Sequence, residues 1–168
     1  MWPFIKKERL PGIKRDLQGK LIFELTEEEN REVEKVFAMF KRPDGEFVVK
    51  KEVADEIEKG MIAMGLFNCA KDQIIQSEFD SNKGKKMEFI DRAIASVAKA
   101  YTFCPLPIYM YDMACFMEMN GRNNEARTAF RSFLELQEKF RPSQIQEVLL
   151  DSQQRDVDEA IKDAKAKA

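Results

Sequence analysis

The chain has 168 residues, of which 44% are hydrophobic and 35% charged, with a net charge of −2 and no histidine. This length and apolar content suffice for one hydrophobic core, so we expect a single domain with tails. The slightly negative net charge disfavours nucleic-acid binding driven by counterion release. The absence of histidine excludes imidazole catalysis and histidine-rich metal sites.

Residues 1–20 differ in charge from the rest of the chain. They hold six Lys and Arg residues against two acidic residues, and Pro3 interrupts their few apolar side chains. We therefore expect a basic, flexible N-terminal arm over residues 1–20, followed by a single helical domain over residues 21–168. No later window reaches membrane-spanning length, so the sequence restricts any membrane contact to this arm.

The first half of the domain is predicted to be mainly helical. A short extended segment at 21–25 precedes a helix that begins at Thr26, where Thr26 and Glu29 form a capping box. The next predicted elements are a helix over 48–66, a shorter helix from Asn68 to Phe79, and a polar loop over 81–86.

The second half shows stronger helical periodicity. Apolar residues repeat at helical spacing from Met87 until Pro105 and Pro107, which end one helix and begin the next. Gly121 is expected to end that helix in a left-handed conformation, and a further helix follows to about Leu136. Capping pairs at Ser143 with Gln146 and at Asp156 with Glu159 predict two more helices. The expected fold is therefore all-α, with about seven helices.

The segment from Pro107 to Leu136 resembles a tetratricopeptide repeat. The resemblance rests on the stretch "GRNNEARTAF" and on the bulky and small residues at the expected positions, which are Met110, Met113, Ala114, Met117, Gly121, Ala126, Phe130 and Phe133. A partial second match precedes it in "AIASVAKAYTFCPLP", and the resemblance covers about residues 87–150. It implies antiparallel helical hairpins stacked in a right-handed array, with the extra helices at either end as caps.

The resemblance also implies a function. Such repeats bind a peptide or helix of another protein against the first helix of each hairpin, on the face turned away from the second helix. Here that face would carry Ile108, Tyr111, Cys115 and Glu118, which we expect to be partly exposed and to bind the partner. The alternative is that helix 87–103 or the C-terminal helices cover this face. The expected role is that of an adaptor or small subunit of a complex, with a homo-oligomer left open.

A second resemblance gives an alternative function. Segments around Gly45 and, 39 residues later, around Gly84 resemble a pair of EF-hands. However, Lys41, Arg42 and Pro43 occupy positions where a calcium loop needs oxygen ligands, and lysines crowd the second loop. The alternative is therefore a degenerate EF-hand-like helical regulatory protein without strong calcium binding, and the two segments are otherwise ordinary helical hairpins.

The sequence offers little for catalysis or cofactor binding. Neither a G-x-G-x-x-G nor a G-x-x-x-x-G-K-[S/T] loop is present, and acidic clusters such as 27–29 are typical of a solvated helix face. We assign no catalytic, cofactor-binding or metal-binding residue and do not expect an enzyme. The three cysteines, Cys69, Cys104 and Cys115, lack CxxC spacing and lie among apolar residues, which favours reduced thiols and a cytoplasmic location.

Overall fold

The computed structural model of the chain describes residues 13–15, 17–18, 21–40 and 51–168. These residues form seven helices and one small antiparallel hairpin, which confirms the predicted all-α class. In chain order the elements are β1 (Ile13–Arg15), β2 (Leu21–Phe23), α1 (Glu27–Phe40), α2 (Lys51–Phe79), α3 (Lys83–Phe103), α4 (Pro107–Met119), α5 (Asn123–Lys139), α6 (Gln144–Ser152) and α7 (Val157–Lys167).

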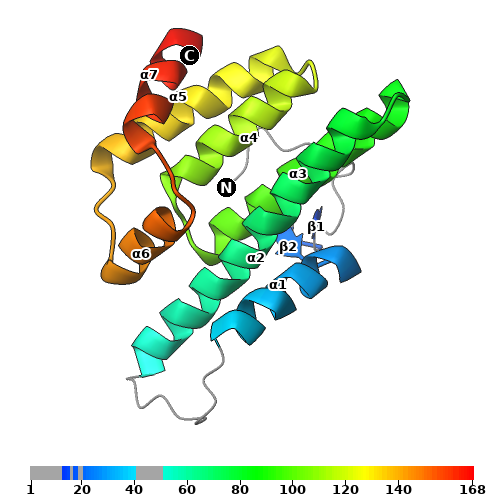
Figure 1. Cartoon of the computed structure of the whole chain (residues 1–168). Coiled ribbons are helices and arrows are strands. Elements are labelled where there is room, and N and C mark those ends of the chain that lie inside the picture. The colour runs from blue at the N-terminus through cyan, green and yellow to red at the C-terminus, as the bar shows by residue number, and fades with distance from the viewer. Residues whose placement is uncertain (1–12, 16, 19–20, 41–50) are drawn as a thin grey trace.

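Neighbouring helices from α1 to α5 pack against one another as successive antiparallel hairpins (Figure 1). The core is centred on α3 and α4, because α3 has α2 on one side and α4 on the other. All eight residues from Ala93 to Ala100 are buried, and Met113 and Met117 of α4 are fully buried. Several small side chains in α3, four of them alanine, permit this close packing on more than one side.

The α1 helix is fixed at its start and at its crossing with α2. The predicted capping box forms: the amide of Glu29 donates to Thr26 Oγ1 at 3.2 Å, and the amide of Thr26 donates to Glu29 Oε1 at 2.8 Å. At the crossing, a Cβ added at Gly65 would lie 2.6 Å from the Cα of Val33. Only glycine therefore allows α1 to approach α2 so closely.

The helix boundaries differ from the prediction at two places. The helices expected over 48–66 and from Asn68 are one helix, α2, because nothing near Asn68 removes a backbone hydrogen bond as proline would. The polar loop expected over 81–86 is shorter, since α3 begins at Lys83. Asn82 caps α3 by accepting a hydrogen bond from the amide of Lys85 at 3.1 Å.

The predicted turn between α4 and α5 is confirmed. Gly121 has a φ of +73°, and its amide donates to the carbonyl of Glu118 at 3.1 Å. The amide of Arg122 donates to the carbonyl of Met117 at 2.9 Å, which completes a Schellman motif. The caps of α6 and α7 are also confirmed, at Ser143 with Gln146 and at Asp156 with Glu159.

Most of the predicted N-terminal arm lies outside the described residues. Its described part includes β1, which pairs with β2 so that Ile13 lies opposite Phe23. None of the helices in the described part of the chain has the length and apolar content needed to cross a membrane.

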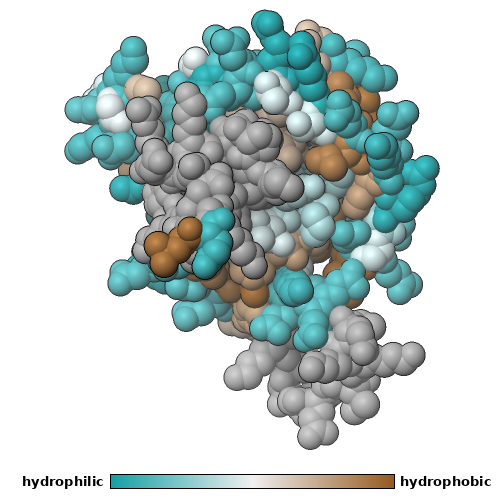
Figure 2. Space-filling view, turned by 180° about the vertical axis from the view of Figure 1, so that it is seen from behind, coloured by the Kyte–Doolittle hydropathy of each residue, from teal (hydrophilic) through white to brown (hydrophobic). Residues whose placement is uncertain are grey.

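Seen from behind, most of the described surface is hydrophilic, and apolar residues show in small groups between the polar ones (Figure 2). Large apolar side chains that remain exposed include Met39, Ile75, Phe79 and Val148. Scattered apolar side chains of this kind are ordinary on a folded protein and do not by themselves define a binding surface.

Candidate functional site

After α5 the chain turns back and lies against α2, α4 and α5. We call residues 143–168, which include α6 and α7, the C-terminal segment. Its α6 contacts α2, and its α7 contacts α5 and α4 (Figure 1). The hydroxyl of Ser143 donates to the carboxylate of Glu56 on α2, which fixes the start of α6. Leu149 of α6 is buried.

Between α6 and α7 an arginine enters a polar site formed by α2 and α4. The guanidinium of Arg155 donates to both carboxylate oxygens of Asp112, and the distance from Nη1 to Oδ2 is 2.7 Å. The guanidinium carbon also lies 4.9 Å from the centre of the Phe67 ring. Close by, the amide nitrogen of Gln153 donates to the hydroxyl of Tyr109 at 2.8 Å. We call Asp112, Tyr109 and Phe67 the arginine site.

The ion pair in the arginine site is largely shielded from water. The side chains of Arg155 and Asp112 are 13% and 11% exposed. Burial raises the pKa of Asp112 above its ordinary value, and the hydrogen bonds and charge of Arg155 limit that rise. Burial alone would lower the pKa of Arg155, but the hydrogen bond and charge of Asp112 raise it. Each group therefore compensates the desolvation of the other.

The α7 helix covers a group of aromatic rings on α4 and α5. Tyr111 lies with its ring centre 5.8 Å from that of Phe130 and 5.5 Å from that of Phe133. Ala160 and Ala164 of α7 are buried. Because alanine is small, these positions let α7 approach the neighbouring helices closely.

Polar contacts at the edge of this interface hold α7 to α4. The hydroxyl of Tyr111 donates to Asp163 Oδ2 at 2.7 Å, and this hydrogen bond, together with Lys167, lowers the pKa of Asp163. Lys167 Nζ lies 3.1 Å from Glu118 Oε1 and 3.2 Å from Asp163 Oδ2. The side chains of Lys167 and Glu118 are 35% and 43% exposed, so their ion pair is accessible to water and salt.

The four residues predicted to bind a partner occupy different environments. Ile108 is 1% exposed and belongs to the core, so the expectation that it would be partly exposed is wrong. Tyr111 and Cys115 are half-buried, and Glu118 is exposed. The α7 helix covers Tyr111, as in the alternative in which a C-terminal helix covers this face. The prediction that Tyr111 faces away from the second helix of the hairpin is wrong, because its ring packs against Phe130 and Phe133 of α5. A role of the four residues in partner binding stays a prediction.

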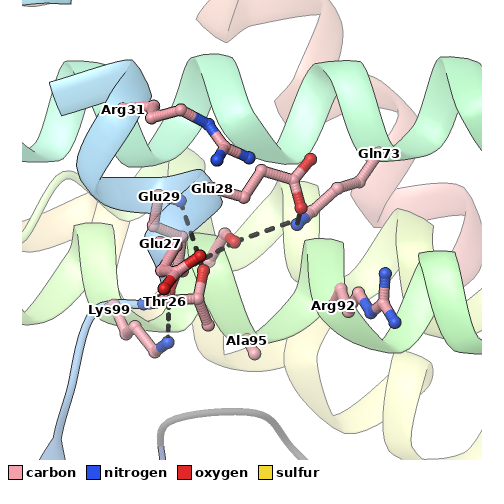
Figure 3. A pocket seen from close by; sticks show the side chains of 10 residues that line it. Thr26, Glu27, Glu28, Glu29, Arg31, Gln73, Arg92, Ala95 and Lys99 are labelled. Atoms are coloured by element: carbon pink, nitrogen blue, oxygen red, sulfur yellow. Dashed lines mark hydrogen bonds and ion pairs between the residues drawn. The ribbon is translucent and has the colours of Figure 1, made fainter. Parts of the chain in front are cut away.

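A separate polar cavity of about 420 Å³ lies between α1, α2 and α3 (Figure 3). At its floor the fully buried Lys99 donates to Glu29 Oε1 at 2.6 Å, and the hydroxyl of Ser96 donates to Glu29 Oε2 at 2.8 Å. Glu29 also accepts the amide of Thr26, so its carboxylate is well supplied with donors. We interpret this cluster as a structural link between α1 and α3.

The described residues do not form a calcium site of the EF-hand type. In the second candidate loop, residues 83–91 belong to α3, so they cannot wrap around an ion. The first candidate loop, around Gly45, lies largely outside the described residues. Within the described part of the chain, no three acidic or cysteine side chains are grouped as metal ligands.

The arginine site is not among the predicted sites, although the sequence contains a signal for it. Asp112 is the only charged residue between Pro107 and Met117, in a helix that is otherwise strongly apolar. Lys99 stands in the same way among the small and apolar residues of α3. A lone charge in such a stretch indicates a buried ion pair, because burial of an unpaired charge is very costly. The partners lie far away in the sequence and carry no comparable signal.

Comparison with known proteins finds no family model, no curated protein and no solved structure that matches this chain.

Proposed function

We propose that the chain is a protein-interaction module that binds a helical segment of a partner protein against α2, α4 and α5. It would act as an adaptor or small subunit of a cytoplasmic complex. The observation that carries this proposal is the position of the C-terminal segment, which already lies on these helices through α6, Arg155 and α7. A surface that accepts one such segment has the shape and polar groups to accept another of similar chemistry.

The contacts of α7 suit an exchangeable occupant. The helix has 11 residues, a length at which an isolated helix is marginal in water. Its two buried residues, Ala160 and Ala164, are small, Val157 and Ile161 are only partly buried against the core, and its ion pair with Glu118 is exposed. Release of α7 would uncover the aromatic rings of Tyr111 and Phe130. In this proposal Tyr111, Cys115 and Glu118 contact the partner after α7 has left.

The chemistry of the cysteines supports an interaction role over thiol catalysis. Burial raises the pKa of Cys69 to about 12 and those of Cys104 and Cys115 to about 11. At neutral pH these thiols carry very little of the reactive thiolate. All three are free, which suits a reducing compartment such as the cytoplasm.

A matched pair of variants on α7 tests the proposed function. Ala164 is fully buried and Ala166 is exposed on the same helix, so Ala164→Arg should displace α7 whereas Ala166→Arg should leave it docked. Affinity capture from the native cell, followed by mass spectrometry, should recover a partner more efficiently with Ala164→Arg. Adding Tyr111→Ala and Glu118→Lys to that variant should abolish the gain.

Two results would argue against the proposal. The first is that Ala164→Arg and Ala166→Arg recover the same proteins in the same amounts, although circular dichroism shows both chains folded. The second is that the gain survives Tyr111→Ala with Glu118→Lys, which would place the partner on a different surface.

A further inference from the structure

We propose that the arginine site selects the partner: the segment bound against α2 and α4 carries an arginine that pairs with Asp112, and Arg155 of the chain itself is an internal substitute for it. This inference rests on the proposed function and adds the chemical class of the partner. The partner is a protein segment in which an arginine lies just before a short amphipathic helix with small residues on its buried face.

The geometry of the site favours arginine over lysine. Both oxygens of Asp112 accept hydrogen bonds from one guanidinium, a two-point contact that the single ammonium of lysine does not reproduce. The Phe67 ring lies 4.9 Å from the guanidinium carbon, where a planar cation interacts favourably with an aromatic ring. Because α2 supplies Phe67 and α4 supplies Asp112, the arginine contacts side chains of two helices at once.

The burial of Asp112 explains why the site must be filled. An ionised carboxylate that is 11% exposed is costly without a cation beside it. If Arg155 leaves, an incoming arginine restores both hydrogen bonds, whereas a segment without arginine leaves Asp112 with only the charge of the nearby, exposed Lys71. The cost of an unpaired Asp112 therefore discriminates between partners.

Two neighbouring contacts indicate which other side chains the partner segment should carry. Gln153, two residues before Arg155, reaches the hydroxyl of Tyr109, so a hydrogen-bonding side chain is preferred at that position. After the arginine, Ala160 and Ala164 are spaced four residues apart and buried, which requires small side chains at the matching positions of an incoming helix. The expected order is thus a polar residue, an arginine and an alanine-bearing helix.

The C-terminal segment competes with any partner because it is part of the same chain. An attached segment has a high effective concentration, so a partner must bind the freed face more tightly or be present in excess. The C-terminal segment therefore sets a minimum affinity for a partner. Partner segments that lack arginine bind too weakly to displace it, whereas those that fill the arginine site displace it.

Binding of a synthetic peptide to the full chain tests the inference. The chain carries Arg155→Ala and Ala164→Arg, which weaken its own segment and leave Asp112, Tyr109 and Phe67 intact. The probe is a fluorescent peptide of residues 143–168, and binding is followed by anisotropy. We expect the peptide to bind this chain, and Arg155→Ala in the peptide to weaken binding by about tenfold or more. The matched control, Lys165→Ala in the peptide, removes an exposed cation and should leave binding nearly unchanged.

The outcomes separate the inference from the proposed function. If no form of the peptide binds, the proposed function fails together with the inference. If the Arg155→Ala peptide binds as tightly as the unaltered peptide, the surface binds helices but the arginine inference is overturned. Asp112→Asn in the chain should abolish the difference between the two peptides.

The unaltered chain offers a second measurement that requires no destabilised variant. An excess of the unaltered peptide should compete with the internal segment and increase the alkylation rate of Cys115, which lies beside Tyr111 under α7. The Arg155→Ala peptide at the same concentration should increase it much less. Equal acceleration by both peptides would overturn the inference.

Discussion

Arg155 and Asp112 form a buried ion pair with two hydrogen bonds although 43 positions separate them in the chain. The pair joins the link between α6 and α7 to the middle of α4. It has a structural consequence that is independent of any partner, because each group is stabilised mainly by the other.

Removal of Arg155 should destabilise the chain more than its replacement by lysine. Arg155→Ala removes both hydrogen bonds to the buried carboxylate of Asp112 and leaves only the charge of the nearby Lys71, a defect that costs about 3 kcal/mol. Arg155→Lys keeps the charge but loses the two-point contact, so a smaller loss is expected. Urea unfolding measures the free energy of unfolding of both variants. The double variant Arg155→Ala with Asp112→Ala should lose less of this free energy than the two single variants lose together. Additive losses would show that the two residues do not interact.

The reactivity of Cys115 should report whether α7 is docked. Burial raises the pKa of this thiol to about 11, so at pH 8 very little thiolate is present and alkylation is slow. Ala164→Arg should expose Cys115, lower its pKa towards the ordinary value and accelerate alkylation. Cys69 and Cys104, which are buried in the core, should stay slow in the same experiment. Mass spectrometry of the modified peptides distinguishes the three sites, and an unchanged rate at Cys115 would mean that α7 does not protect it.

Replacing only one residue of the Glu29 and Lys99 pair should strongly destabilise the fold. Both side chains are at most 1% exposed, so Lys99→Met should cost about 3 to 5 kcal/mol by leaving Glu29 unpaired. Replacing both residues with apolar ones of similar size should recover only part of the loss, because the Thr26 amide and the Ser96 hydroxyl then lose their acceptor on Glu29. As a control, Lys35 forms an exposed pair with Glu32, and Lys35→Ala should leave the unfolding midpoint unchanged. Equal effects of Lys99→Met and Lys35→Ala would contradict the burial of the Glu29 pair.

The crossing of α1 and α2 should tolerate only glycine at position 65. A Cβ there would meet the backbone of Val33 at 2.6 Å, so Gly65→Ala should force the helices apart and cost about 1 to 3 kcal/mol. Gly84 is exposed near the start of α3, and a Cβ at that position meets only the end of the Asn82 side chain. Because the contacted atom is Asn82 Oδ1, which caps the helix and lies 3.3 Å from the added Cβ, Gly84→Ala should be close to neutral and cost far less than Gly65→Ala. If both changes have the same effect in thermal unfolding, α1 does not cross α2 at Gly65.

Local features of the fold were predictable from the sequence, and distant pairs were not. The capping box of Thr26 and Glu29 spans three residues, and the Gly121 turn depends on one backbone conformation, so short sequence patterns identify both. By contrast, Lys99 meets Glu29 from 70 positions away. Such a pairing depends on how the helices pack, which the spacing of apolar residues does not specify. The prediction that Ile108 is partly exposed was wrong for the same reason, because the burial of this residue depends on neighbouring helices.

The continuity of α2 shows a second limit of sequence patterns. Asn68 is a common helix-capping residue, and an apolar run ends just before it, so a new helix was expected there. In the structure α2 passes through this position, and its residues from Ala63 to Ala70, apart from Asn68, are buried against neighbouring helices. Tertiary packing stabilises the longer helix, and this outweighs the local preference of asparagine.

Native-state hydrogen exchange of the unaltered chain measures whether the C-terminal segment opens separately from the rest of the fold. If the segment is an exchangeable occupant of α2 and α4, the amides of Val157–Lys167 should exchange through a local opening. The free energy of that opening should be well below that of the amides in α3 and α4, and it should depend little on low concentrations of denaturant. If the amides of α7 instead exchange only with global unfolding, at the same free energy as those of α4, the segment is a permanent part of the core and the account is contradicted.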